Sequence, residues 1–77
     1  MIFCVGSINI DFITRVEKLP EAGETILGED FMVFPGGKGA NQALAASRAG
    51  SCVKLIGAVG RDQNKEPALS NIRESDI

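Results

Sequence analysis

The chain has 77 residues, of which 44% are hydrophobic and 23% charged, and its formal net charge is −2. This composition is globular rather than disordered, and the slight negative charge argues against a nucleic-acid partner, which would favour a basic surface. No run is long and apolar enough to span a membrane, and the first residues lack the basic segment of a signal peptide. We therefore expect a cytoplasmic protein that binds neither nucleic acid nor membrane.

The chain opens with a short apolar run, residues 2–7, whose closing Gly-Ser pair is typical of the end of a buried strand. Asn9 and Asp11 follow, each between apolar residues, so an extended chain places both polar side chains on the same side. A structural interpretation is a turn asparagine and a solvated aspartate. A functional interpretation is a ligand site, because open α/β sheets bind ligands at the carboxyl ends of their parallel strands.

The next part of the chain predicts a small antiparallel flap outside the main core. Residues 13–16 and 25–34 read as extended segments, and Pro20 and Gly23 mark a turn between them. The sequence Gly-Glu-Asp at 28–30 indicates a bulge or tight turn inside the second segment.

An alanine-rich run at residues 39–49 predicts a helix that ends at Gly50, and residues 53–59 predict a second buried strand. Strand, helix and strand make a βαβ unit with parallel strands and a right-handed crossover. A second helix is expected over residues 64–74, with Asn64 as its N-cap and Pro67 in its first turn. Both cysteines, Cys4 and Cys52, lie in apolar strand-like runs and are expected to be buried thiols in a reducing compartment.

The string Gly-Gly-Lys-Gly-Ala-Asn at residues 36–41 stands where the extended segment gives way to the helix. It has neither the spacing of a phosphate-binding P-loop nor that of a dinucleotide fingerprint. It could be a simple glycine turn, with Lys38 and Asn41 pointing to solvent. Alternatively, glycines let backbone N–H groups approach a ligand, and the helix N-terminus adds partial positive charge. The expected ligand is then rich in oxygen, a phosphate or the hydroxyls of a sugar.

These two polar clusters should converge on one small site, because a helix start and the end of the preceding strand share an edge of the sheet in a βαβ unit. The candidate site residues share a place at that edge. They are Asn9, Asp11, Gly37, Lys38, Gly39 and Asn41. The chain contains no His, which removes Ser-His and Cys-His catalysis and His-ligated metals from the candidate chemistries.

Four segments carry a resemblance to the PfkB family of carbohydrate kinases: residues 5–11, 19–25, 36–43 and 57–62. The resemblance covers the whole chain, residues 1–77. It implies an α/β fold, namely the N-terminal βαβ portion of a Rossmann-like ribokinase-type fold, with a small β lid at about residues 12–34. By the same resemblance the chain is an incomplete domain, the front of a longer protein.

The resemblance implies an ATP-dependent sugar kinase that phosphorylates ribose or a related sugar. The residues matching the family's sugar-binding positions are the six candidates named above, which leaves no catalytic residue, cofactor ligand or metal ligand in this chain. ATP and Mg²⁺ are implied for the complete protein, with a monovalent cation as a further candidate and none bound by this chain alone. The lid is implied to close over the sugar and to join two copies as a homodimer.

Two departures from the family pattern bear on this interpretation. The family's Gly-x-Gly-Asp segment, which carries the catalytic aspartate, has no counterpart in the 77 residues, so the chain alone is expected to be inactive. Lys65 stands near a usual glycine, and Pro67 is unusual in the helix that follows. Two alternatives stay open: another PfkB-type kinase for a nucleoside, fructose or a sugar acid, and a truncated non-catalytic sugar-binding or interaction module.

Overall fold

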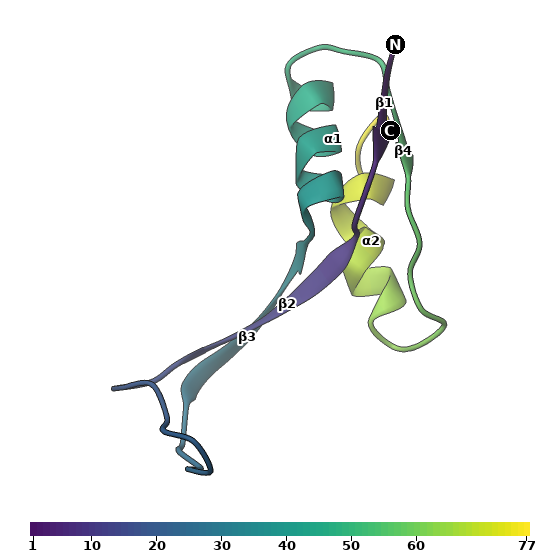
Figure 1. Cartoon of the computed structure of the whole chain (residues 1–77). Helices are drawn as coiled ribbons and strands as arrows, with labels where there is room; N and C mark the ends of the chain where they lie inside the picture. Colours follow the sequence, from purple (N-terminus) through teal and green to yellow (C-terminus); the bar gives the residue numbers. More distant parts are fainter.

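The computed structural model describes all 77 residues and shows a packed unit from which a two-stranded ribbon projects (Figure 1). In the packed unit, β1 (Ile2–Val5) and β4 (Val53–Ile56) pair in parallel, and α1 (Lys38–Arg48) packs on both strands. The second helix, α2 (Lys65–Arg73), lies beside α1 and reaches the base of the ribbon. The predicted α/β class and the parallel βαβ pairing are therefore confirmed.

Strand β4 is shorter than predicted, because it ends at Ile56 instead of residue 59. The chain leaves the sheet at Gly57, where an added Cβ would lie 2.9 Å from the carbonyl oxygen of Gly6 and 2.8 Å from the side chain of Ile8. Only a glycine fits against the turn after β1 at this point. Strand β1 likewise ends at Val5, two residues before the predicted boundary.

Helix α1 begins and ends one residue before its predicted boundaries. Its buried face contains Ala40, Ala43 and Leu44, whereas Ala45 is exposed, so the small-residue face is narrower than the alanine count suggests. The expected stop at Gly50 is confirmed. Its φ of 98° is a left-handed conformation, and its amide donates to the Ser47 carbonyl at 3.0 Å, as in a Schellman cap.

Helix α2 starts after Asn64, the predicted N-cap position, but the Asn64 side chain makes no capping hydrogen bond. The Asn64 amide instead donates to Oδ1 of Asp62 at 2.9 Å, which fixes the turn leading into the helix. Pro67 lies in the first turn, as predicted, where its missing N–H costs no intrahelical bond. Ala68 is the buried residue of this helix.

The ribbon consists of β2 (Asn9–Arg15) and β3 (Glu29–Gly36), which pair antiparallel as predicted for the flap. Its strands reach further toward the packed unit than the expected lid boundaries of about 12 and 34. The polar-apolar alternation that begins at Asn9 continues without a break into residues 13–15. Residues 9–15 therefore form one strand. Asn9 and Asp11 consequently lie on the ribbon itself.

The outer half of the ribbon is irregular at the place that the Gly-Glu-Asp sequence indicated. The strand register shifts between Ile13 and Arg15, and Asp30 takes a φ of 56°. The Thr14 hydroxyl donates to the Glu29 carbonyl at 2.9 Å and closes the bulge. Beyond it, the loop turns at Gly23, which has a φ of 77°.

Few side chains are fully buried, and the buried apolar ones belong to α1, β4 and α2. On the ribbon, Phe12 and Phe31 stack with ring centroids 5.7 Å apart but stay 57% and 66% exposed. The expectation of buried thiols is wrong for Cys52, which is exposed, while Cys4 is half-buried, and the two are unpaired. None of the helices has the length and hydropathy needed to cross a bilayer.

Candidate functional site

The structure brings residues 6–9, which lead from β1 into β2, against residues 36–41, which lead from β3 into α1, and we call this contact the junction. A Cβ added to Gly39 would lie 2.6 Å from the carbonyl carbon of Gly6 and 2.6 Å from the amide nitrogen of Ser7. The Ala40 amide also donates to the Ser7 carbonyl at 3.0 Å. The junction is therefore a direct backbone-to-backbone contact between the two predicted clusters.

Gly37 occupies the N-cap of α1 with a φ of 100° and a ψ of 134°. A Cβ at this position would lie 2.6 Å from the Ser7 carbonyl oxygen and 2.8 Å from the Asn9 amide nitrogen. Both the positive φ and the missing space require glycine. Gly37 thus sets the angle at which the ribbon turns into the helix.

The first turn of α1 leaves backbone donors free. Of its first four amides, Ala40 donates to Ser7 and Asn41 donates to the Gly37 carbonyl at 2.9 Å. The amides of Lys38 and Gly39 have no acceptor within the chain. Together with the partial positive charge of the helix end, these donors can bind the oxygens of a ligand.

Asp11 places a carboxylate next to this helix start. Asp11 and Asn9 share one face of β2, because successive strand residues point to opposite faces, and Asp11 is exposed. The Asp11 carboxylate lies over Gly36, the residue directly before the N-cap: a Cβ at position 36 would be 2.5 Å from Oδ2. An acceptor-only group at Gly36 and free backbone donors at Lys38 and Gly39 therefore lie along one short segment.

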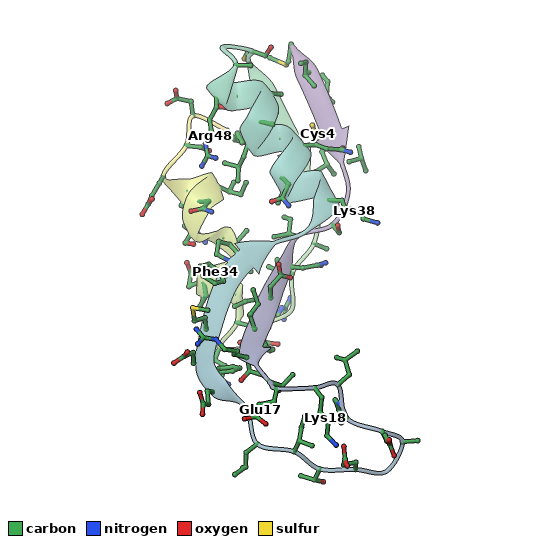
Figure 2. All side chains as sticks on the ribbon, turned by 90° about the vertical axis from the view of Figure 1, so that its left-hand side faces the viewer. Cys4, Glu17, Lys18, Phe34, Lys38 and Arg48 are labelled. Carbon is green, nitrogen blue, oxygen red and sulfur yellow. The ribbon has the colours of Figure 1, made fainter.

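The structure does not bring every predicted residue into contact with the others. Asn41 is exposed and makes no side-chain hydrogen bond, and Figure 2 shows the Lys38 side chain extending away from the base of α1. The expected placement of Asn9 and Asp11 at the end of a parallel strand is also wrong. Strand β1 ends at Val5, and after a three-residue connection the two residues lie in the first part of β2, on the antiparallel ribbon.

The largest hollow of the molecule lies away from the junction. It measures about 600 Å³ and opens at the far end of the ribbon, where Figure 2 labels Glu17 and Lys18. Its lining residues come from the ends of both strands and the loop between them. They are Arg15, Val16, Glu17, Lys18, Ile26, Leu27 and Glu29. We favour the junction as the candidate site, because it joins free backbone donors to a carboxylate, whereas the hollow is an open space between two loop arms.

Gly6, Ser7 and Gly36 belong to the junction but were absent from the predicted site. Each acts through its backbone or through its lack of a side chain. Reasoning from chemically active side chains therefore does not identify them. The Gly-Ser pair at the end of a strand and the first glycine of the Gly-Gly-Lys-Gly string were the available signs. The chain holds no group of three or more His, Cys, Asp or Glu side chains arranged to hold a metal ion.

Comparison with known proteins gives consistent matches over nearly the whole chain. The model of the pfkB family carbohydrate kinases matches residues 1–77. The chain is 50% identical over 74 residues to a ribokinase from Lactococcus lactis and 44% identical over 73 residues to one from Bacillus subtilis, covering 95% of this chain and 25% of each relative. It also resembles the solved ribokinase structure from Giardia lamblia, with a TM-score of 0.79 and 38% identity over 95% of this chain and 22% of that one. The chain thus spans about a quarter of the length of these relatives.

Proposed function

This chain belongs to the pfkB family of carbohydrate kinases, and we propose that it is the sugar-binding front of an ATP-dependent kinase that phosphorylates ribose or a related sugar. The observation that carries the proposal is the junction, where the Asp11 carboxylate lies against Gly36 and the amides of Lys38 and Gly39 are free. The names of the relatives, ribokinases, support the sugar class.

The junction suits a polyhydroxylated ligand because each hydroxyl both donates and accepts hydrogen bonds. In the proposed complex Asp11 accepts from sugar hydroxyls, and the free amides donate to sugar oxygens. Asn9, on the same face as Asp11, and Asn41, one turn into α1, supply side-chain amides that do both. The glycines at 37 and 39 let the sugar approach the backbone. Asp11 is a binding group in this scheme.

ATP and Mg²⁺ would supply the transferred phosphoryl group and offset its charge. The residues of this chain do not fit either: no side-chain cluster suits a metal, and the Gly-Gly-Lys-Gly string lacks the P-loop spacing. We therefore derive no step of phosphoryl transfer from these 77 residues and assign that chemistry to parts of the protein outside them.

The ribbon is proposed to act as a lid over the sugar and as the contact between two copies of the protein. Its support is the exposed apolar surface around Phe12 and Phe31 and its antiparallel strands, whose outer edges are open to pairing. Use of ATP and the two unpaired cysteines fit a reducing, cytoplasmic location.

The direct test is ribose binding and phosphorylation by the full-length product of the gene, with and without Asp11→Asn. The substitution keeps the side-chain shape but removes a charged acceptor, so ribose affinity should fall by about 1.5–3 kcal/mol, roughly 10- to 150-fold in Kd. Titration calorimetry measures the Kd, and a coupled assay measures turnover with ribose, fructose, a nucleoside and a sugar acid.

The matched control is Asp30→Asn, on the same ribbon but at its far end. Asp30 pairs with Arg15 at 2.9 Å, both side chains are more than half exposed, and Asn tolerates its positive φ. Ribose binding within twofold of wild type in Asp11→Asn would contradict the site, and equal losses in both variants would show a general effect on the ribbon.

A second candidate is a non-catalytic sugar-binding module, favoured by the absence of a Gly-x-Gly-Asp segment from the chain. It predicts ribose binding that depends on Asp11 but no turnover with any sugar of the panel. Turnover with a nucleoside, fructose or a sugar acid in preference to ribose would point to another branch of the family.

A further inference from the structure

Among the three glycines of the Gly-Gly-Lys-Gly string, Gly36 is the one whose missing Cβ would have Asp11 atoms as its nearest neighbours. Built on Gly36, a Cβ would lie 2.5 Å from Oδ2, 2.8 Å from Cγ and 2.9 Å from Oδ1 of Asp11. All three terminal atoms of the aspartate therefore lie where a side chain at position 36 would begin.

The backbone at Gly36 does not itself require glycine. Its φ is not positive, unlike that of Gly37, and it forms a regular pair with Asn9 at the end of β3. Gly36 is also buried, although the strand residues before it on β3 are largely exposed. The carboxylate takes the space above Gly36, so the nearest obstacle to an alanine there is the Asp11 side chain.

We propose that Gly36 is a positioning residue for sugar binding, because its missing side chain lets the Asp11 carboxylate lie across the ribbon beside the N-terminus of α1. This inference rests on the proposed function and extends it to a residue that does not touch the sugar itself. With a larger residue at 36, the carboxylate has to leave this position, because the added Cβ would lie 2.5 Å from its Oδ2.

The helix start gives the carboxylate a reason to keep this position. Gly36 directly precedes the N-cap of α1, where the partial positive charge of the helix favours an anion. The amides of Lys38 and Gly39, in the first turn of the same helix, are free to donate to a ligand. A displaced carboxylate would leave these donors in place but break the donor-acceptor pairing that a sugar hydroxyl needs.

The test is a double-mutant cycle in the full-length protein with Gly36→Ala, Asp11→Ala and both together. Ribose Kd should rise roughly tenfold in Gly36→Ala, the loss of about one charged hydrogen bond. In the Asp11→Ala background, the same glycine substitution should change Kd by less than about twofold, because the obstructing carboxylate is gone. A thermal melt of the four proteins should show the same coupling.

Gly60→Ala is the matched control for the general effect of replacing glycine by alanine. Its φ is not positive, and the nearest atom to the added Cβ is Oδ2 of Asp62 at 3.2 Å, the flexible end of a side chain. It should leave ribose Kd unchanged.

Wild-type affinity in Gly36→Ala, or equal losses in both backgrounds, would overturn the positioning role while Asp11-dependent binding left the proposed function intact. If Asp11→Ala leaves ribose binding unchanged, both the sugar site and the positioning role are wrong. Coupling in the melts alone would then show a packing contact without a binding role.

Discussion

The junction and the ribbon differ in how their residues are held. At the junction, Gly39 lies so close to Gly6 that no side chain fits between the two backbones. On the ribbon, Phe12 and Phe31 stack on each other but leave more than half of their surface in water. The junction thus holds close backbone contacts beside the candidate binding groups, whereas the ribbon beyond it carries large apolar side chains that stay exposed.

This contrast follows from what each region has to do. Binding groups must hold their geometry to within a fraction of an ångström, which rigid backbone contacts achieve more reliably than long side chains. A lid has to move, and exposed hydrogen bonds with few buried contacts favour local opening. The exposed aromatic surface gives such a lid an apolar area that becomes buried when the lid closes or contacts a second copy of the protein.

The largest effect that the contrast predicts is at the junction itself. In Gly39→Ala, the new Cβ would meet the backbone of Gly6 and Ser7 at 2.6 Å, so the turn after β1 has to move away from α1. Overpacking of this kind costs about 1–3 kcal/mol or more, which exceeds the gain of at most about 1 kcal/mol in helix propensity. Urea unfolding of the full-length protein measures the difference.

Gly60→Ala serves again as the control, here for the urea unfolding of Gly39→Ala. Its only close neighbour is a side-chain tip, so its unfolding free energy should change by less than about 0.5 kcal/mol. If Gly39→Ala proved as stable as Gly60→Ala, the junction would be loose, and the distinction between the two regions would fail.

A smaller effect on protomer stability is expected on the ribbon. Phe31→Ser removes one ring of the exposed Phe12 stack, worth about 0.5–1.5 kcal/mol. The same change should weaken self-association, because it removes apolar area from the proposed contact between copies. Light scattering over a concentration series measures association, and Phe31→Leu, which keeps most of the apolar area, should retain it. Unchanged association in Phe31→Ser would remove this surface from the dimer contact.

Much of the fold could be predicted from the sequence because its signals are local. The alanine run, Gly50 and the Gly-Glu-Asp sequence define α1, its end and the bulge by composition alone. The ends of β1 and β4 were predicted too late, because Gly6 and Gly57 end these strands through contacts with each other and with Ile8. Such contacts join residues far apart in the chain, and a pattern read along the sequence does not contain them.

The sequence predicted the residues of the candidate site better than it predicted which elements carry them. The two clusters do approach each other, but Asp11 meets the helix start from an antiparallel ribbon rather than from the end of a parallel strand. Alternation of polar and apolar residues indicates a strand without indicating its partner. The role of Gly36 was also hidden, because only the packing of the two strands shows which side chain fills the space beside a glycine.

Hydrogen-deuterium exchange of the full-length protein with and without ribose tests the central claim most directly, because it compares the two regions in one experiment. If the sugar binds at the junction, ribose should slow exchange in peptides that cover residues 37–41, where the amides of Lys38 and Gly39 gain an acceptor. Protection of residues 15–29 around the distal hollow, with residues 37–41 unchanged, would contradict it and place the sugar at the far end of the ribbon.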